Sequence, residues 1–242
     1  MISIVSPVYN SKNCLAKLVE KITINLKNIT NIFEIILIDD GSTDGSWEKI
    51  VELKKKNKLI KGFKLKKNYG QHYAIYKGIK LATKKIIIVM DCDLQDDPSY
   101  IFDLYNCYLK YKKPVIIKHS YEDFKLKDRI VSNLFWLFLS ILSFKKFSPN
   151  LGNYLLINKQ VKDKYLLIES IGYLYGDLIS LGTKFISIEK KRSFGIRKKT
   201  TYNIFKLLYL AATLVLKYSF IFKYFYRIKN KKIKKIFVEK KV

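Results

Sequence analysis

Acidic side chains are the residues best suited to do chemistry in this otherwise basic chain. Seven of its 20 acidic residues fall in two short segments, each of which begins where an apolar run ends: Asp39, Asp40, Asp44, Asp91, Asp93, Asp96 and Asp97. Like charges packed together repel one another, so a divalent cation is an economical way to offset them. Asp91 and Asp93 are two residues apart, and a bend in the chain can aim both carboxylates at one ion.

The expected metal follows from the kind of oxygen that these side chains offer. Gln95 lies two residues beyond Asp93 and adds a carbonyl oxygen. Carboxylate and amide oxygens are hard donors, which favours Mg²⁺ or Mn²⁺ over Zn²⁺. The sequence therefore predicts a metal site at Asp91, Asp93 and Gln95. The alternative is a solvated acidic loop in which Asp97 and Pro98 begin a helix, because Asp-x-Asp by itself is a weak pattern.

The elements that must position these acids alternate between apolar runs and helical patterns. Runs rich in Ile and Val predict strands at 2–9, 33–40, 62–68, 85–91 and 115–120. Helical spacing or turn signals predict helices at 13–28, after the turn at 41–46, at 71–83 and from 98 to about 111. Such strands are typical of a mostly parallel sheet covered by helices on both faces. Both acidic segments follow strands, and ligands bind at the carboxyl ends of strands in open α/β sheets.

Two apolar segments in the second half of the chain are expected to lie at a membrane surface. Residues 130–144 carry no charge, but as a helix they rise about 22 Å, short of the roughly 30 Å hydrocarbon core. Residues 204–226 are long enough to span it. Their polar side chains fall on one narrow stripe that lipid would bury at a cost: Lys206, Thr213, Lys217 and Tyr224. We therefore expect amphipathic helices with this stripe in water; the alternative is that 204–226 packs onto the first domain or a sister subunit.

The charge of the chain predicts a polyanionic partner. Its 242 residues include 47 Lys and Arg against 20 Asp and Glu, a formal net charge of +27. Nucleic acid, an anionic membrane surface or a phosphorylated substrate would attract such a protein. We expect no nucleic acid, because no recognition motif occurs and the acidic segments would repel phosphate. The three cysteines fit no disulfide or zinc spacing, which favours a reduced, cytosol-facing chain.

Four motifs in order carry a resemblance to a known family: PVYN at 7–10, IDDGSTDGS at 38–46, NYGQHYAIYKGI at 68–79 and MDCDLQDDP at 90–98. The chain resembles the inverting GT-A glycosyltransferases of family 2, which use nucleotide-diphosphate sugars. The last motif is similar to that of the dolichyl- and polyprenyl-phosphate sugar synthase branch. The resemblance implies the α/β GT-A fold and is close over 2–98 and loose over 99–200. Neither a Gly-x-Gly-x-x-Gly nor a P-loop pattern competes with it.

The resemblance also implies roles for individual residues. Those implied to bind the nucleotide sugar are Pro7, Tyr9, Asn10, Asp39, Asp40, Lys67, Gly70 and Asp91. Asp91 and Asp93 match the family's Asp-x-Asp, and Gln95 matches a metal-contacting position. RSFGIRK at 192–198 resembles a late family pattern, which implies phosphate contacts for Arg192 and Lys198 and makes Arg192 catalytic along with the two aspartates. Arg129 matches an arginine on the acceptor side.

The chain departs from the family at several positions. Ser11 stands where Glu is frequent, Arg197 replaces the serine of the late pattern, and LGNY at 151–154 only faintly resembles the branch's Gly-Asp-Phe-Arg motif. Many members carry two transmembrane helices after the catalytic domain, and no clean pair is visible here. A scaffold without catalysis is the remaining non-enzyme reading, and the intact Asp-x-Asp argues against it.

The implied reaction is metal-dependent, inverting transfer of one sugar to polyprenyl phosphate. A lipid phosphate arrives ionised and needs no base; Arg129, Arg192 and Lys198 would hold it. The alternative acceptor is a sugar hydroxyl of a lipid-linked glycan in envelope polysaccharide assembly, which requires a carboxylate base. Glu169 and Asp177 are the candidates for that base.

The expected organisation is a catalytic domain at 1–200 and a basic, membrane-associating segment at 201–242. The last sixteen residues carry eight Lys or Arg and one Glu. Such a segment is attracted to an anionic leaflet, which predicts a peripheral protein on the cytoplasmic face of the inner or plasma membrane. Whether the chain forms a homo-oligomer stays open.

Overall fold

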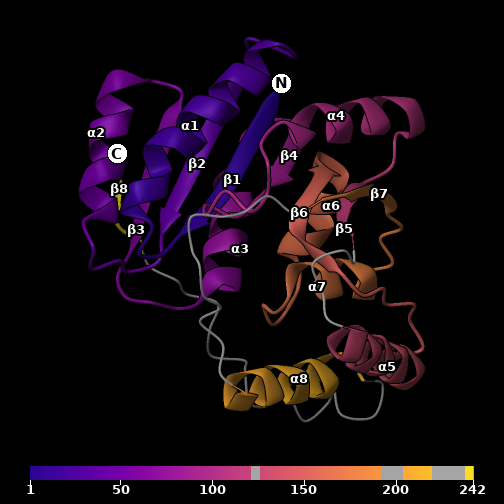
Figure 1. Cartoon of the computed structure of the whole chain (residues 1–242). Coiled ribbons are helices and arrows are strands. Elements are labelled where there is room, and N and C mark those ends of the chain that lie inside the picture. The colour runs from indigo at the N-terminus through magenta and orange to yellow at the C-terminus, as the bar shows by residue number, and fades with distance from the viewer. Residues whose placement is uncertain (121–125, 192–203, 220–237, 242) are drawn as a thin grey trace.

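The fold is built on one mixed sheet. The computed structural model describes residues 1–120, 126–191, 204–219 and 238–241 (Figure 1). Within them, eight strands pair in the order β7-β5-β6-β4-β1-β2-β3-β8. Their bounds are β1 Ile2–Val8, β2 Phe33–Asp39, β3 Ile60–Leu65, β4 Ile86–Val89, β5 Val115–His119, β6 Leu151–Asn158, β7 Ile186–Lys190 and β8 Val238–Lys241.

The first half of the chain forms the parallel part of the sheet, as predicted. β1 pairs in parallel with β2 and with β4, and β2 pairs in parallel with β3. Every residue of β1 and β2 is buried. Helices cover both faces of these strands, so the strands read as near-continuous apolar runs rather than as alternating patterns.

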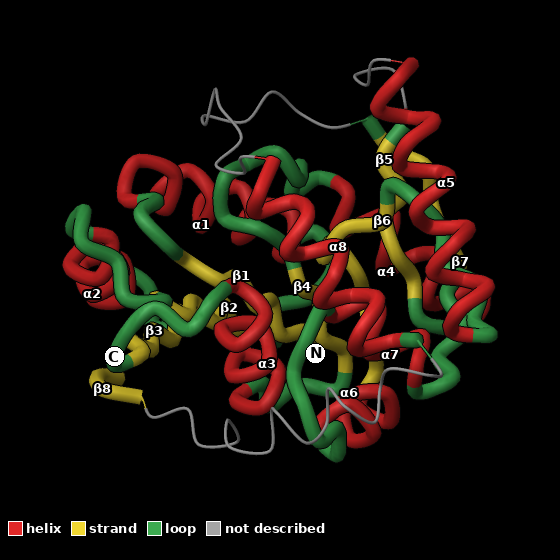
Figure 2. The backbone as a smooth tube through the Cα atoms, turned by 90° about the horizontal axis from the view of Figure 1, so that it is seen from below, coloured by secondary structure: helices red, strands yellow, loops and turns green. Residues whose placement is uncertain are grey.

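Helices α1 (Lys12–Lys27), α2 (Ser46–Lys56) and α4 (Tyr100–Tyr111) cover one face of the sheet. Helices α3 (Gln71–Leu81), α6 (Lys159–Leu166) and α7 (Leu174–Ser180) cover the other face. Helices α5 (Leu126–Ser143) and α8 (Ile204–Tyr218) pack against each other beyond this second layer. Viewed from below in Figure 2, α8 lies beside α7 and α5. The fold is thus an α/β sandwich of the expected class.

Sequence reasoning missed three of the described strands, β6, β7 and β8, and of these β6 lies in the middle of the sheet. It pairs antiparallel with β4 on one side and antiparallel with β5 on the other. Its residues from Asn153 to Ile157 are buried, and they join the β1–β4 part of the sheet to β5 and β7. The second half of the chain is therefore structurally continuous with the first.

The water-facing stripe expected for residues 204–226 is wrong at Lys217. The Lys217 side chain is only 9% exposed and forms an ion pair with Asp177 of α7. Leu214 and Tyr218 of α8 are also buried, so this helix packs onto the first domain, which was the alternative. The physical reason is the buried carboxylate of Asp177, which pairs with the Lys217 ammonium in place of water. Thr213 is half-buried; Lys206 and Tyr224 lie outside the residues whose side chains are described.

The far end of the chain also joins the sheet. β8 pairs antiparallel with β3 and forms one edge of the described sheet. The boundary expected at residue 200 therefore does not separate the sheet from the later residues of the chain. Among the described helices, none is both long enough and apolar enough to span a bilayer.

Candidate active site

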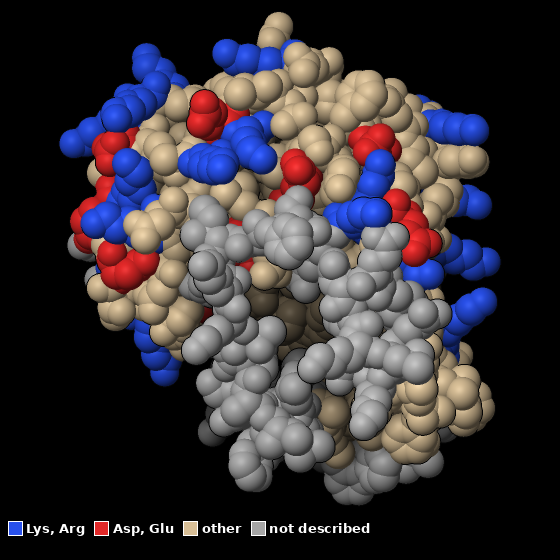
Figure 3. All heavy atoms as spheres, viewed as in Figure 1, with Lys and Arg blue, Asp and Glu red and all other residues tan. Residues whose placement is uncertain are grey.

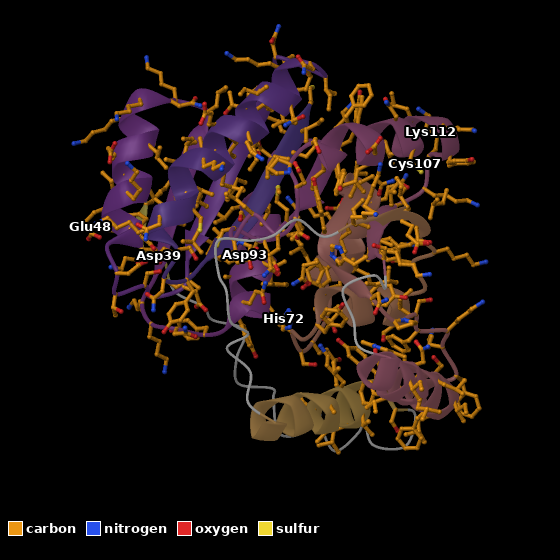
Figure 4. All side chains as sticks on the ribbon, in the orientation of Figure 1. Asp39, Glu48, His72, Asp93, Cys107 and Lys112 are labelled. Atoms are coloured by element: carbon orange, nitrogen blue, oxygen red, sulfur yellow. The ribbon has the colours of Figure 1, made fainter. Side chains whose placement is uncertain are left out.

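Four parallel strands bring the predicted site residues to one edge of the sheet. Asp39 is the last residue of β2, and Asp91 comes two residues after β4 ends. Asn10 follows β1 by two residues, and Gly70 precedes α3 directly. Figure 4 labels Asp39, Asp93 and His72, and all three lie on the lower side of the sheet. Figure 3 shows acidic side chains near the centre of the face that it draws, among Lys and Arg side chains.

Asp40 fixes the loop between β3 and α3. Its carboxylate accepts hydrogen bonds from the backbone N–H groups of Tyr69, at 2.8 Å, and Gly70, at 2.9 Å. Asp40 is buried, and this burial raises the pKa of its carboxyl to about 6, although the two N–H donors oppose the shift. Both oxygens of Asp40 thus accept backbone hydrogen bonds that fix this loop, and the direct nucleotide contact that the resemblance implied stays a prediction.

Asp39 is the acid that keeps an oxygen for a ligand. It is fully buried, and its Oδ1 accepts from the N–H of Ser42 at 3.1 Å. Among the described residues, its Oδ2 has no hydrogen-bond partner. Burial raises the pKa of the Asp39 carboxyl, and the bonds from Ser42 partly offset this. A buried acceptor without a partner is costly, so Oδ2 suits a hydroxyl or N–H donor from a bound molecule.

Asn10 and Gly41 hold the neighbouring loop in place. Asn10 donates from its backbone N–H to Ser42 Oγ at 3.0 Å, and its Oδ1 accepts from the N–H of Thr43 at 3.0 Å. Gly41 has φ +73°, and a Cβ there would lie 2.7 Å from the backbone nitrogen of Asn68. Two loops from different strands therefore approach each other as closely as backbones allow.

The other residues assigned to the nucleotide line this end of the sheet. Pro7 is buried in β1 opposite Ile38, whereas Tyr9, just beyond the strand, is 44% exposed. The Lys67 ammonium lies 5.5 Å from the ring centroid of Tyr69 and its side chain is exposed. The structure thus places a wall, an exposed aromatic ring and a cation around the end of β1 and β3.

The three predicted metal ligands share one side of the loop after β4. Asp91, Asp93 and Gln95 are all partly exposed, while Cys92 and Leu94 between them are buried. Leu94 has a left-handed backbone with φ +63°, so these residues alternate between partly exposed and buried without forming a strand. The Asp91 Oδ1 accepts from Gln71 Nε2 at 2.7 Å, and the Asp93 Oδ1 accepts from the N–H of Gln95 at 3.1 Å.

This donor set fits a hard cation only in part. In the described portions of the chain, no three His, Cys, Asp or Glu side chains gather closely enough to hold a metal alone. Two carboxylates and an amide oxygen would fit Mg²⁺ or Mn²⁺ if further oxygen ligands came from a bound substrate. Cys92 is buried, and burial raises the pKa of its thiol to about 12, so the thiol is neutral.

Asp96 supports this loop from beneath. It is buried, its Oδ2 accepts from the N–H of Asp91 at 3.3 Å, and its Oδ1 lies 3.5 Å from Nε2 of His119 on β5. Sequence reasoning grouped Asp96 with the other acids, but only the pairing of β5 with β6 brings His119 to it. Asp96 is therefore a support of the site rather than one of its exposed ligands.

The candidate bases differ in environment. Glu169 is exposed, whereas Asp177 is 3% exposed and its oxygens are engaged by Lys217, by the Tyr218 hydroxyl at 2.7 Å and by the N–H of Gly172 at 2.8 Å. These contacts explain Asp177 as a structural acid and argue against its acting as a base. The phosphate-binding assignments Arg129, Arg192 and Lys198 lie outside the residues whose side chains are described.

Little in the sequence indicated that two further residues, Gln71 and Tyr173, belong to the site. Gln71, which bonds Asp91, stood inside one of the four motifs but had no assigned role. Tyr173 packs edge-on against His72 with ring centroids 5.6 Å apart, and nothing in its local sequence indicates this. Both depend on contacts between distant segments.

Comparisons with known proteins agree with this geometry. One solved structure, glucosyl-3-phosphoglycerate synthase from Mycobacterium tuberculosis in complex with Mn²⁺, UDP and phosphoglyceric acid, is 16% identical with a TM-score of 0.64. The match covers 89% of this chain and 76% of that one. A mannosyltransferase from Pyrobaculum calidifontis in complex with GDP-Man and Mn²⁺ is 12% identical with a TM-score of 0.57, covering 90% and 62%.

A third similar structure is S. aureus TarS, residues 1–349, in complex with UDP-GlcNAc. It is 15% identical with a TM-score of 0.57, and the match covers 91% of this chain and 67% of that one. At these identities the likenesses show a shared fold, the GT-A fold. The sequence itself matches the family described as Glycosyl transferase family 2 over residues 3–164. This stretch is well over half of the chain and contains every acid of the two segments, and the chain therefore belongs to glycosyl transferase family 2.

Proposed function

We propose that this glycosyltransferase moves a sugar from a nucleotide-diphosphate sugar to polyprenyl phosphate in a metal-dependent, inverting reaction. One observation carries the proposal: Asp39, whose Oδ2 has no hydrogen-bond partner among the described residues, and the partly exposed Asp91 and Asp93 lie at the carboxyl ends of strands in the parallel part of the sheet. Similar structures hold Mn²⁺ with UDP or with GDP-Man. The nucleotide base and the sugar are left to experiment.

The donor would lie across the ends of β1 and β2. Asp39 would accept a hydrogen bond from the nucleoside through Oδ2, and Tyr9 and Asn10 would line the same end. Lys67 and Gly70 would flank the pocket, with Pro7 behind it. Asp40 would contribute indirectly, by holding the Tyr69–Gly70 backbone.

The diphosphate would lie next to Asp91, Asp93 and Gln95. These residues would hold Mg²⁺ or Mn²⁺, which supplies charge stabilisation to the leaving nucleoside diphosphate when bound. Gln71 would keep Asp91 in one orientation through its 2.7 Å hydrogen bond. Substrate oxygens would complete the coordination that the described side chains do not.

The acceptor proposal rests on the need for a base. A phosphate monoester is already ionised at neutral pH, so Arg129, Arg192 and Lys198 would only have to hold it. Asp177, one of the two candidate bases, is engaged by Lys217 and Gly172, which supports a reaction without a base. A glycan hydroxyl acceptor would instead require Glu169 or another carboxylate.

A peripheral position on the cytoplasmic leaflet is part of the proposal. Helix α5 and the residue that follows it expose large apolar side chains: Ile130, Val131, Leu134, Leu137, Phe138, Ile141 and Phe144. The exposed Lys145 and Lys146 follow at once. An apolar face bordered by cations suits the interface of an anionic membrane. Because Lys217 of α8 packs inward, the proposed membrane contact rests on α5, the other of the two segments expected at the membrane.

A donor screen tests the proposed function. Purified full-length protein is incubated with Mn²⁺, short-chain polyprenyl phosphate and one radiolabelled UDP- or GDP-sugar at a time. The proposal expects one sugar to enter the lipid phase as the phosphodiester, with loss of product in excess EDTA. Transfer to a lipid-linked glycan but not to polyprenyl phosphate would replace the acceptor, and no transfer from any nucleotide sugar would overturn the proposal.

A further inference from the structure

The contact between α7 and α8 is an ion pair in the core. Lys217 donates from Nζ to Oδ1 of Asp177 and to the backbone carbonyl of Ser170, the latter at 2.9 Å. Burial raises the pKa of Asp177 and lowers that of Lys217, while the attraction between the two opposes both shifts. Buried ion pairs stabilise little over apolar residues of the same size, but loss of one partner leaves an uncompensated buried charge. This pair therefore sets the position of α8.

Two glycines leave room for that position. A Cβ on Gly172 would collide with the Lys217 side chain, and a Cβ on Gly176 would lie 2.6 Å from Cζ of Tyr218. The α8 side chains thus rest directly on the backbone of the 170–173 loop and of α7. Any movement of α8 must move this backbone as well.

Tyr218 extends the contact along the loop. Its hydroxyl lies 2.7 Å from Oδ1 of Asp177 and 2.9 Å from the carbonyl oxygen of Tyr173. One hydroxyl proton serves these two acceptors in turn. The other oxygen of Asp177 accepts from the N–H of Gly172 at 2.8 Å. Asp177, Lys217 and Tyr218 together hold the loop backbone at three points.

Tyr173 carries this constraint to the active site. Its hydroxyl donates to the carbonyl of Leu151 at the start of β6, and its ring packs edge-on against His72 of α3. His72 directly follows Gln71, which bonds Asp91. Burial, followed by the neighbouring Tyr175 and the Asp91 carboxylate, raises the pKa of the Tyr173 hydroxyl well above its usual value. Contacts through His72 and Gln71 thus connect Tyr173 to Asp91.

Tyr173 lies away from the donor side of the sheet. The nucleotide residues follow β1 and β2, whereas Tyr173 contacts β6, on the opposite side of β4. Asp91 follows β4, which lies between β6 and β1 in the sheet. Across the sheet, the proposed nucleotide site is therefore followed by the proposed diphosphate site and then by Tyr173. The remaining position beside Tyr173 is the one from which an acceptor can approach the sugar.

We propose that Asp177, Lys217 and Tyr218 are positioning residues that hold the 170–173 loop so that Tyr173 forms a fixed wall on the acceptor side of the transfer. The inference rests on the proposed function, because it takes Asp91 and Asp93 as the reaction centre. None of the three touches substrate. Loosening the loop should slow transfer without weakening donor binding, since misplacement of a reacting group by about 1 Å can cost about 100-fold in rate.

The test uses full-length Tyr218→Phe, which removes the hydroxyl and keeps the ring in the core. A second variant, Lys217→Met with Asp177→Asn, removes both charges at similar volume, so no lone charge is left buried. Tyr111→Phe on the exposed end of α4 is the matched control. We expect kcat to fall about tenfold or more in both test variants, with KM for the nucleotide sugar and calorimetric binding of Mn²⁺ with UDP or GDP within about twofold.

A spectroscopic readout separates this inference from the proposed function. Trp136 of α5 lies 6.2 Å from Tyr173 between ring centroids, and the chain has only one other tryptophan, Trp47. In a Trp47→Phe background, Tyr218→Phe should shift Trp136 emission while the circular dichroism spectrum is retained. Unchanged emission, or unchanged kcat in both folded variants, overturns the positioning role. Absence of any transfer by the wild type instead overturns the proposed function, and the emission still decides the inference.

Discussion

Gln71 donates a hydrogen bond from Nε2 to Oδ1 of Asp91 at 2.7 Å and thereby ties the first turn of α3 to the acid that follows β4. Gly70, the residue directly before this helix, has φ +96°, so the chain turns sharply before Gln71. The bond orients a carboxylate proposed to hold a metal. Partners that orient metal ligands commonly matter almost as much as the ligands themselves.

Replacing Gln71 by Leu should therefore weaken Mn²⁺ binding or turnover by about 10–100-fold. Gln160→Leu on the exposed surface of α6 is the matched control and should change neither. Metal titrations of activity, together with electron paramagnetic resonance of bound Mn²⁺, measure the effect. Equal Mn²⁺ affinity in wild type and Gln71→Leu would show that Asp91 needs no such partner.

Gly41 allows a prediction that separates backbone strain from collision. Gly41 and Gly182 both have left-handed backbones, at φ +73° and +79°, but only Gly41 faces another backbone, whereas nothing lies within 4 Å of a Cβ at Gly182. Gly182→Ala should cost about 1–2 kcal/mol of unfolding free energy from strain alone. Gly41→Ala should cost more and should also weaken nucleotide binding, because Asn68 must move. Denaturant unfolding and calorimetry with UDP and GDP measure both; equal effects at the two sites would contradict the packing described.

The acid Glu34, at the opposite end of the strands, predicts how stability depends on pH. Although burial opposes its ionisation, hydrogen bonds from Lys61, Ser3 and Thr83 outweigh burial and lower its pKa to about 2. A lowered carboxyl pKa stabilises the fold above the unfolded value of about 4.5, and this stabilisation is lost as pH falls towards 2. At pH 7 the shift corresponds to about 3 kcal/mol.

Glu34→Gln should therefore lower the unfolding free energy at pH 7 by about that amount and flatten its dependence on pH between about 5 and 2. Glu52→Gln is the control: Glu52 also has a pKa lowered to about 2 by Lys49 and Lys56, but it lies in solvent. Solvent screening should leave its loss small. Urea titrations at several pH values measure both variants, and an equal loss in the two would refute the role of burial.

The lipid-phosphate acceptor predicts that Glu169→Gln keeps most of its activity, because an ionised phosphate needs no base. A general base contributes roughly 10²–10⁴ in rate, so the alternative predicts a very different result. Initial rates with polyprenyl phosphate and correctly folded variant protein decide between them. A loss of about a thousandfold would move the proposal to a hydroxyl acceptor.

The membrane-facing role of α5 predicts that Phe138→Glu with Ile141→Glu reduces binding to vesicles of phosphatidylglycerol and phosphatidylcholine by tenfold or more. Each buried side chain of this size contributes about 1.5–3 kcal/mol, and a charge replaces it. Ile24→Glu, an equally exposed position on α1 in the opposite helical layer, is the control. Vesicle co-sedimentation measures the binding, and unchanged binding in the double variant would place the membrane contact elsewhere.

The sequence predicted the first half of the fold because its signals are local. β1, β2 and β4 are apolar runs separated by helices, and acids stand at the ends of β2 and β4, so the edge holding Asp39 and Asp91 follows from the parallel topology. β6 escaped notice because Gly152 and Asn153 near its start resemble a loop, and its two antiparallel partners lie far away in the chain. The pattern showed that Lys206 and Lys217 share a face of the helix but not what that face meets. Asp177, the partner of Lys217, is 40 residues away.

Release of nucleoside diphosphate by Asp93→Asn tests the central claim most directly. The substitution removes one charge from the proposed metal site and keeps its shape, while Asp163→Asn on the exposed surface of α6 removes the same charge elsewhere. With Mn²⁺, the accepted nucleotide sugar and polyprenyl phosphate, we expect wild type and Asp163→Asn to release nucleoside diphosphate and Asp93→Asn to release essentially none. The assignment of the site would be contradicted if Asp93→Asn turned over as fast as the wild type, or if the wild type kept its full rate in excess EDTA.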